Sequence, residues 1–302
     1  MTTISSFMAR GAAATFPAVF LSGAALAQGA PTGWTSSVDG VVIYQDDADL
    51  DGGGDFSATR AFLRAGGLYN TGNGLFIGLG LSYGQLNYEF SDPANSLWDD
   101  VTDLRLAVPV TWQLDNGARV LVVPQLRWDY EDGANMSDGF TGGVFAGVAW
   151  PVSDALRIGP AFGVFSQLDD SAQIFPALLI DWDIAPRWNL STGNAPGATQ
   201  GPGLTLTHAL NDSINLSLAA RVEQAQFRLD DSGLAPGGVG EDSAVPVVLA
   251  MEYQPNPGLS FSVFAGAEFG GELTVSDAAG SVVSRQDYDT TPIAGFAFRL
   301  RF

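Results

Sequence analysis

The sequence contains no cysteine, and His208 is its only histidine in 302 residues. All 13 basic residues are arginine, so lysine is missing as well. These absences exclude a disulfide, a thiolate metal site, a cysteine nucleophile, a P-loop lysine and a Schiff-base lysine. The formal charge of −20 argues against nucleic acid as a partner, because its binders need a basic face. After residue 27, no apolar run approaches the ~18–20 residues that a membrane helix needs.

The first 27 residues have the layout of a bacterial secretory signal. A short polar stretch ends at Arg10, a stretch of small and apolar residues follows, and a small-x-small motif ends at Ala27. We therefore predict a signal peptide over 1–27 and a mature domain over 28–302. An N-terminal anchor helix is the alternative, which Pro17 and the short apolar core disfavour.

Apolar residues alternate with small or polar residues along most of the mature chain, a period of two that predicts β-strands. A helical period of 3.6 fits none of these runs. The alternation predicts fourteen strands, or twelve if the two least regular ones, the ninth and tenth, are lost. The predicted strands are 34–45, 56–69, 74–90, 103–114, 118–130, 139–151, 156–168, 172–185, 188–193, 203–210, 214–229, 243–253, 259–273 and 289–302.

Short turns alternate with longer, acidic connections between these strands. The longer ones are 46–55, 91–101, 131–138, 230–242 and 274–287. Such sorting is typical of outer-membrane barrels and has no reason to occur in a soluble sandwich. The predicted fold class is all-β: a transmembrane antiparallel up-and-down β-barrel of about 14 strands (alternative 12), with long acidic extracellular loops and short periplasmic turns.

Aromatic residues gather at the strand ends nearest the short turns, each on the apolar face of its strand. Rings with one polar edge prefer the headgroup layer, so a belt of them marks a membrane boundary. The opposite strand face carries mostly small residues and sparse charge, which suits a lumen. The predicted membrane-interface aromatics are Trp34, Tyr69, Trp112, Trp150, Trp182, Tyr253 and Phe302.

The leader, the alternating strands and the acidic loops resemble those of Gram-negative outer-membrane β-barrel proteins. The segment from Tyr288 to Phe302 resembles the C-terminal signal read by the outer-membrane assembly machinery, because it ends in an aromatic residue. The stretch from Pro176 to Glu223 looks like uncharacterised outer-membrane barrel families described as domains of unknown function. This second resemblance covers about a sixth of the chain and implies no catalytic residues.

Charged side chains are expected on the lumen face of several strands, either as a constriction that selects solutes or as pairs that stiffen the wall. The predicted turn at 169–171 sets Arg157 opposite Asp183, which predicts an ion pair. The predicted lumen-lining residues are Arg60, Arg64, Arg105, Arg127, Asp129, Arg157, Asp181, Asp183, Arg221, Glu223, Glu252, Glu268, Arg299 and Arg301.

Three weaker patterns compete with plainer interpretations. Asp181 and Asp183 have the spacing of a glycosidase carboxylate pair, but a ladder in the lumen explains them better. Asp47, Asp49 and Asp51 match the opening of a calcium loop. However, position twelve of that loop is Ala58, so loosely held divalent cations are the better expectation. His208 fits an interfacial residue better than a hydrolase centre.

The leading functional prediction is a passive, porin-like channel for small polar solutes or ions in the cell outer membrane. The alternative is a structural or surface-interaction barrel with a closed lumen. An outer-membrane hydrolase, or a transporter of hydrophobic substrates with a pocket around Phe76, Phe145, Phe165 and Phe175, is less favoured. We expect no enzymatic activity, no cofactor and no bound metal. The expected partners are lipid, lipopolysaccharide, the assembly machinery and loosely bound divalent cations.

Overall fold

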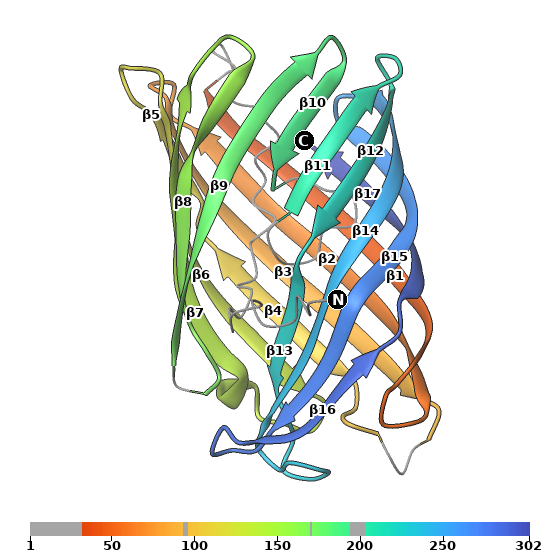
Figure 1. Ribbon diagram of the computed structural model, residues 1–302. Coiled ribbons are helices and arrows are strands. Elements are labelled where there is room, and N and C mark those ends of the chain that lie inside the picture. Colours follow the sequence, from red (N-terminus) through yellow and green to blue (C-terminus); the bar gives the residue numbers. More distant parts are fainter. Residues whose placement is uncertain (1–31, 93–95, 170, 194–202) are drawn as a thin grey trace, which may run out of the picture.

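The chain was analysed as a computed structural model that describes residues 32–92, 96–169, 171–193 and 203–302 (Figure 1). The predicted signal peptide over 1–27 lies outside the described residues. Within the described ranges, no helix is both long and apolar enough to cross a membrane.

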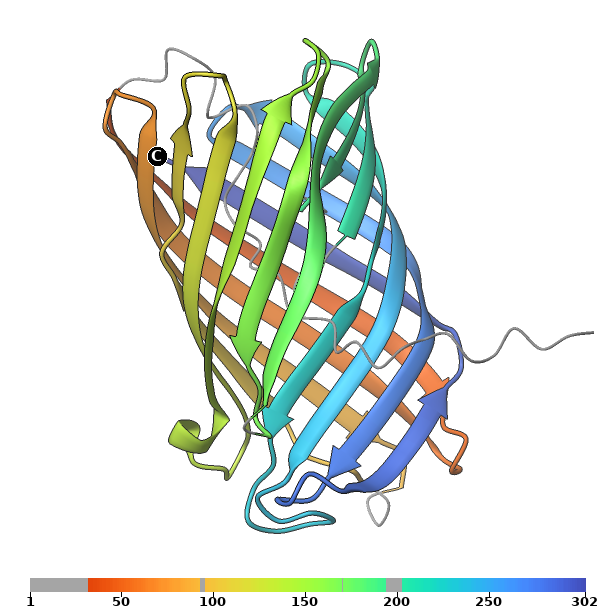
Figure 2. The ribbon, with the colours of Figure 1, turned by 60° about the vertical axis from the view of Figure 1, so that its left-hand side comes forward.

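The strands form one sheet that closes on itself, because β1 pairs with β2 on one side and with β17 on the other. Neighbours along the chain pair antiparallel around the wall (Figures 1 and 2). The strands are β1 Gly33–Asp49, β2 Asp55–Asn70, β3 Leu75–Phe90, β4 Val101–Ala107, β5 Val110–Gln113, β6 Arg119–Glu131, β7 Phe140–Pro151, β8 Leu156–Ser166, β9 Ala172–Ala185, β10 Trp188–Thr192, β11 Gly203–Ala209, β12 Ile214–Arg221, β13 Glu223–Arg228, β14 Val239–Asn256, β15 Leu259–Ser276, β16 Val282–Tyr288 and β17 Thr291–Arg301.

Three of these strands are interrupted, and counting each interrupted strand once gives a closed antiparallel barrel of fourteen strands, as predicted. β4 and β5 both pair with β3, β12 and β13 both pair with β14, and β16 and β17 both pair with β15. Pro109 lies in the first gap, where a residue without an N–H cannot donate to the ladder. The alternative of twelve strands is wrong.

Three details differ from the sequence-based expectations. The segment 274–287 is not wholly a loop, because β16 extends the last strand beyond the predicted 289–302. The apolar residues change strand face between Val222 and Leu229, which a bulge would explain, but the pairing of β12 and β13 with β14 keeps one register through Val222, so no bulge lies there. Finally, β8 and β9 align Arg157 with Asp181 and not with Asp183, so the predicted register is wrong by two residues.

The two ends of the barrel differ in width. At the end that carries the long connections, hereafter the long-loop end, β13 pairs with β6 through Arg228 and Tyr130. β16 reaches β1 through a bridge between Tyr288 and Leu50. Strands β1, β2, β3, β4, β6, β13, β14, β15 and β16 therefore form a ring of nine, hereafter the nine-strand ring. β7, β8 and β9 lie outside this ring and form a side wall (Figure 2).

The outward face of the barrel is apolar between two levels of aromatic residues. At the opposite, short-turn end, the predicted interface residues Trp34, Tyr69, Trp150, Trp182, Tyr253 and Phe302 are exposed, and Trp112 is half-buried. A second group nearer the long-loop end was not predicted; it contains the exposed Tyr44, Tyr83 and Phe140. Between the two levels, leucine and valine side chains such as Leu81 and Val263 point outward and are at least half exposed.

Candidate functional site

The interior of the nine-strand ring is filled with apolar side chains. Trp98, from the connection between β3 and β4, lies inside the ring, where its side chain packs edge-on against Phe227 on β13 at 5.0 Å and Tyr88 on β3 at 5.5 Å. Phe56, Leu273 and the other members of this cluster are buried as well. A ring of about eight strands leaves room only for its own side chains, so a core is the expected content of nine strands. The structure therefore gives no support at this end for the porin-like channel predicted from the sequence.

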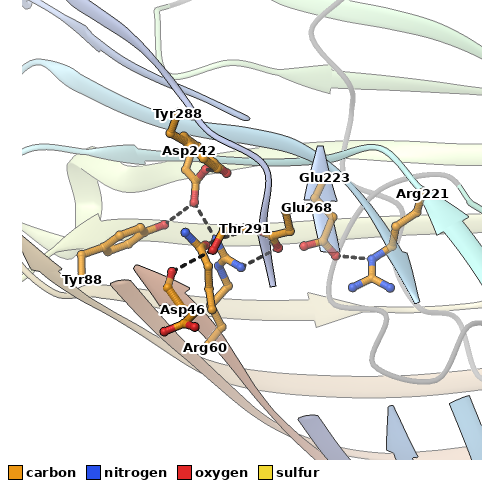
Figure 3. A network of polar contacts seen from close by, with 10 residues as sticks. Asp46, Arg60, Tyr88, Arg221, Glu223, Asp242, Glu268, Tyr288 and Thr291 are labelled. Atoms are coloured by element: carbon orange, nitrogen blue, oxygen red, sulfur yellow. Dashed lines mark hydrogen bonds and ion pairs between the residues drawn. The ribbon is translucent and has the colours of Figure 1, made fainter. Parts of the chain in front are cut away.

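A buried polar network crosses the barrel at the same end (Figure 3). The Arg60 guanidinium on β2 donates to Asp242 Oδ2 on β14 at 3.0 Å and to Glu268 Oε1 on β15 at 2.8 Å. The hydroxyls of Tyr88 and Tyr288 donate to the two oxygens of Asp242 at 3.0 and 3.1 Å. Buried charges persist when they are paired and hydrogen-bonded, and Asp242 receives three donors. The network therefore braces opposite sides of the wall.

Other predicted lumen residues pair along a strand as well as across strands. Arg105 with Asp103, Arg127 with Asp129 at 2.6 Å and Arg221 with Glu223 at 2.5 Å are each two residues apart on one face. On β4 and β6, like charges stand directly opposite: Asp103 faces Asp129 and Arg105 faces Arg127. Opposed like charges repel, so pairing along each strand offsets an unfavourable register.

The remaining predicted lumen residues lie toward the short-turn end. Arg157 donates to the carbonyl of Gly117 at 2.9 Å, and both Asp181 and Asp183 accept from Asn189. The predicted Arg157–Asp183 pair is therefore replaced by contacts within this wall. The others bond to, or stand opposite, polar residues of neighbouring strands. Arg64 bonds to Asp39, Glu252 accepts from Asn215, and Arg299 and Arg301 face Ser260 and Ser37 across the ladder.

Two side chains tie the long connections over the ring. Glu131, beyond the outward Trp128 on β6, accepts the backbone N–H groups of Asp99 at 2.6 Å and Asp230 at 2.8 Å. Burial raises the pKa of the Glu131 carboxyl, and the two N–H donors oppose that rise. Arg228 donates to the carbonyls of Leu168, Gly237 and Asp138 at 2.7, 2.9 and 3.0 Å. This guanidinium fastens the side wall to the ring.

The side wall carries a patch of three phenylalanines on its inward face, hereafter the phenylalanine patch. The ring of Phe175 lies nearly parallel to those of Phe165 and Phe145, at 5.9 and 6.4 Å. Leu121, Val123 and Ala161 complete the buried cluster, to which Phe76 does not belong. The patch matches three of the four residues expected for an apolar pocket.

Glycines let these rings lie flat on the wall. Gly143 stands opposite Phe165, and Gly163 stands opposite Phe175. A Cβ at either glycine would collide with the ring of its partner. An aromatic ring that covers a cross-strand glycine protects the bare backbone and takes little space from the lumen.

A small pocket lies in the fork between the ring and the side wall, hereafter the fork pocket. Phe165 and Leu168 line its apolar part, and Gln173, Gln224, Arg127 and Asp129 line its polar part. In Figure 2, β13 runs toward the long-loop end between β9 and β14. The fork is the region between β13 and the side wall. This pocket adjoins the phenylalanine patch, because Phe165 belongs to both.

The weaker sequence patterns lead to no second site. Within the ranges that the structure covers, no group of three or more His, Cys, Asp or Glu side chains is placed to hold a metal ion, and Asp47, Asp49 and Asp51 are exposed. The imidazole of His208 stacks on Trp188 at 4.3 Å on the outward face near the short-turn end.

Sequence reasoning missed several residues of the site. Asp242 was assigned to a loop because the strand was predicted to begin at residue 243, whereas β14 begins at Val239. Trp98 follows an apolar leucine in an otherwise acidic connection, which was a usable sign that this segment folds inward. Gln173, Gln224 and Arg228 could not be singled out, because glutamine or arginine occurs on most of the predicted strands.

No protein-family description and no curated protein matches this sequence. Among solved structures, an outer membrane channel from Pseudomonas putida F1 is similar at 11% identity and TM-score 0.48, covering 90% of this chain and 96% of its own. The P. putida toluene transporter TodX is similar at 9% identity and TM-score 0.46, covering 90% and 91%. A Pseudomonas aeruginosa FadL homologue is similar at 13% identity and TM-score 0.42, covering 89% of both chains. At these identities and TM-scores the similarity concerns only the general shape of an outer-membrane barrel. It assigns no role to any residue of this chain.

Proposed function

We propose that this chain is an outer-membrane channel for small apolar solutes, aromatic ones in particular. Its placement in the membrane is supported by the outward apolar band between two levels of aromatic residues, because lipid is the medium that such a surface requires. In this orientation the long-loop end is extracellular, and the short-turn end faces the periplasm.

The observation that carries the proposal is the contrast between the filled ring and the phenylalanine patch. Hydrated ions and sugars need a water-filled path, and the core around Trp98 and Phe227 occupies the centre of the extracellular end. Beside that core, Phe145, Phe165 and Phe175 line the inner face of the side wall. Ligand sites are mostly apolar with a few placed polar groups, which describes the side wall and its fork.

A barrel with a closed lumen is the second candidate, because the same filled ring supports it. The two candidates differ in transport. A closed structural barrel passes nothing, whereas the proposed channel carries hydrocarbons and excludes sugars.

Uptake by intact cells tests the proposal. The full chain is expressed in a porin-deficient Gram-negative strain, and the entry of labelled toluene and of a labelled hexose is measured against the empty vector. We expect toluene uptake to rise severalfold and hexose uptake to stay at the background. The purified protein should give little steady conductance in planar bilayers.

Matched variants locate the path. Phe165→Leu should lower toluene uptake, whereas Phe76→Leu, on β3 outside the patch, should not. The heat-dependent shift in gel mobility verifies that each barrel is folded. Sustained conductance with hexose uptake would restore the porin prediction. A folded protein that carries neither solute would favour the closed barrel.

A further inference from the structure

The fork pocket contains two buried amide atoms whose hydrogen-bonding capacity is unused. Gln173 Nε2 and Gln224 Oε1 are both shielded from solvent, and neither has a hydrogen-bond partner within the described part of the chain. Gln224 is only 8% exposed. Leaving a buried polar group unpaired costs about 1–3 kcal/mol, so such atoms call for an explanation.

The other amide atom of each side chain already forms a hydrogen bond within the protein. A ligand can therefore use only the Gln173 donor and the Gln224 acceptor. Gln173 Oε1 accepts from Gln167 Nε2 at 3.1 Å. Gln224 hydrogen-bonds to the Glu241 carboxyl, and Gln226 donates to that carboxyl at 3.4 Å. The residues that carry this unused donor on β9 and this unused acceptor on β13 both line the fork pocket.

The charges that line the same pocket compensate each other. Arg127 and Asp129 form an ion pair at 2.6 Å, so the pocket presents neither a lone cation nor a lone anion. A neutral ligand group that both donates and accepts fits the two amides, and a hydroxyl is the simplest such group. The pocket is too small for an aromatic ring, but Phe165 forms its apolar side and continues into the phenylalanine patch.

We propose that the fork pocket binds the hydroxyl of a neutral aromatic alcohol of the phenol class. The hydroxyl accepts from Gln173 Nε2 and donates to Gln224 Oε1, and the ring lies against Phe165. This inference rests on the proposed function and narrows its substrate class, because unsubstituted hydrocarbons gain nothing from the two amides.

The test compares initial uptake of phenol, toluene and benzoate in the porin-deficient strain that expresses the full chain. Replacing both amides, in Gln173→Leu with Gln224→Leu, should lower phenol uptake about tenfold, the value of two neutral hydrogen bonds. Toluene uptake should stay within about twofold of the wild type. Gln286→Leu is the matched control, since Gln286 Oε1 is also buried and unpaired but lies on β16, outside the fork pocket.

Each outcome separates this inference from the function on which it rests. Phenol uptake that is unchanged in the double variant, while the wild type still carries toluene, overturns the inference alone. An equal decrease in phenol uptake and toluene uptake also overturns it, because the two amides would then only stabilise the wall of the barrel. Benzoate entering faster than phenol would show that Arg127 selects an anion. A wild type that carries no aromatic solute refutes the function and the inference together.

Discussion

At the residue scale, the interior depends on arginines whose partners are close along the chain or directly across the lumen. Arg60 is the extreme case, because it is buried with Asp242, Glu268 and Gln45 around it. Removing one partner of a buried ion pair is costly, since the remaining charge has neither water nor a counter-ion.

Arg60→Leu should therefore lower the free energy of unfolding by about 3–5 kcal/mol. Urea unfolding of the protein in detergent micelles measures this change. Arg285→Leu is the control, because Arg285 is exposed and its 3.5 Å contact with Glu272 is worth less than about 1 kcal/mol. Equal losses in the two variants would contradict the assigned role of the buried network.

At the element scale, strand positions and facing follow from the sequence, whereas register does not. The alternation of apolar and polar residues determines which face of a strand is inward, because a register shift of one residue would move every side chain to the opposite face. A slip of two residues keeps every side chain on its own face. Arg157 was therefore predicted opposite Asp183, whereas its cross-strand neighbour is Asp181. The extension of the last strand into β16 was missed because Val282–Tyr288 combines serine, arginine and aspartate with few apolar residues.

The candidate site could be predicted only in part. The phenylalanines could be predicted as an apolar group on inward faces, because the alternation of inward and outward residues along each strand places them there. The fork pocket could not be predicted, since it depends on β13 pairing with β6, whereas the preceding β12 pairs with β11. The contact between β13 and β6 joins residues 98 positions apart in the sequence. Local patterns carry no information about such a contact.

The glycine–aromatic pairs of the side wall provide a test at this scale. Gly163→Val should displace the ring of Phe175 and cost about 1–3 kcal/mol of stability through overpacking. Combining it with Phe175→Ala should recover part of that loss, so the two changes are not additive. Unfolding free energies of the wild type, both single variants and the double variant measure the coupling. Strict additivity would contradict the packing described here.

At the scale of the whole molecule, fourteen strands surround the short-turn end, whereas the long-loop end contains a ring of nine strands that is filled by its own core. At the short-turn end the wall is lined by small and charged residues, whereas aromatic packing seals the nine-strand ring at the long-loop end. The number of strands alone, which predicts an aqueous channel of intermediate width, is therefore a poor guide to permeability.

Trp98→Ala should open this seal. Loss of a buried tryptophan costs about 3–5 kcal/mol, and the vacated space joins the ring to the wider half of the lumen. We expect steady ion conductance to appear in planar bilayers. Trp188→Ala, on the outward face, should leave conductance at the wild-type value. A folded Trp98→Ala protein that remains silent would place the barrier elsewhere.

The attachment of the side wall to the ring has a mechanical consequence. β7, β8 and β9 continue to the long-loop end as a leaf of three strands, and the Arg228 guanidinium holds backbone carbonyls from two of its connections. This side chain therefore acts together with the β6–β7 ladder and the side chains that line the fork pocket to hold the leaf against the ring. Replacing Arg228 would free two connections of the leaf at once and leave its attachment to those other contacts.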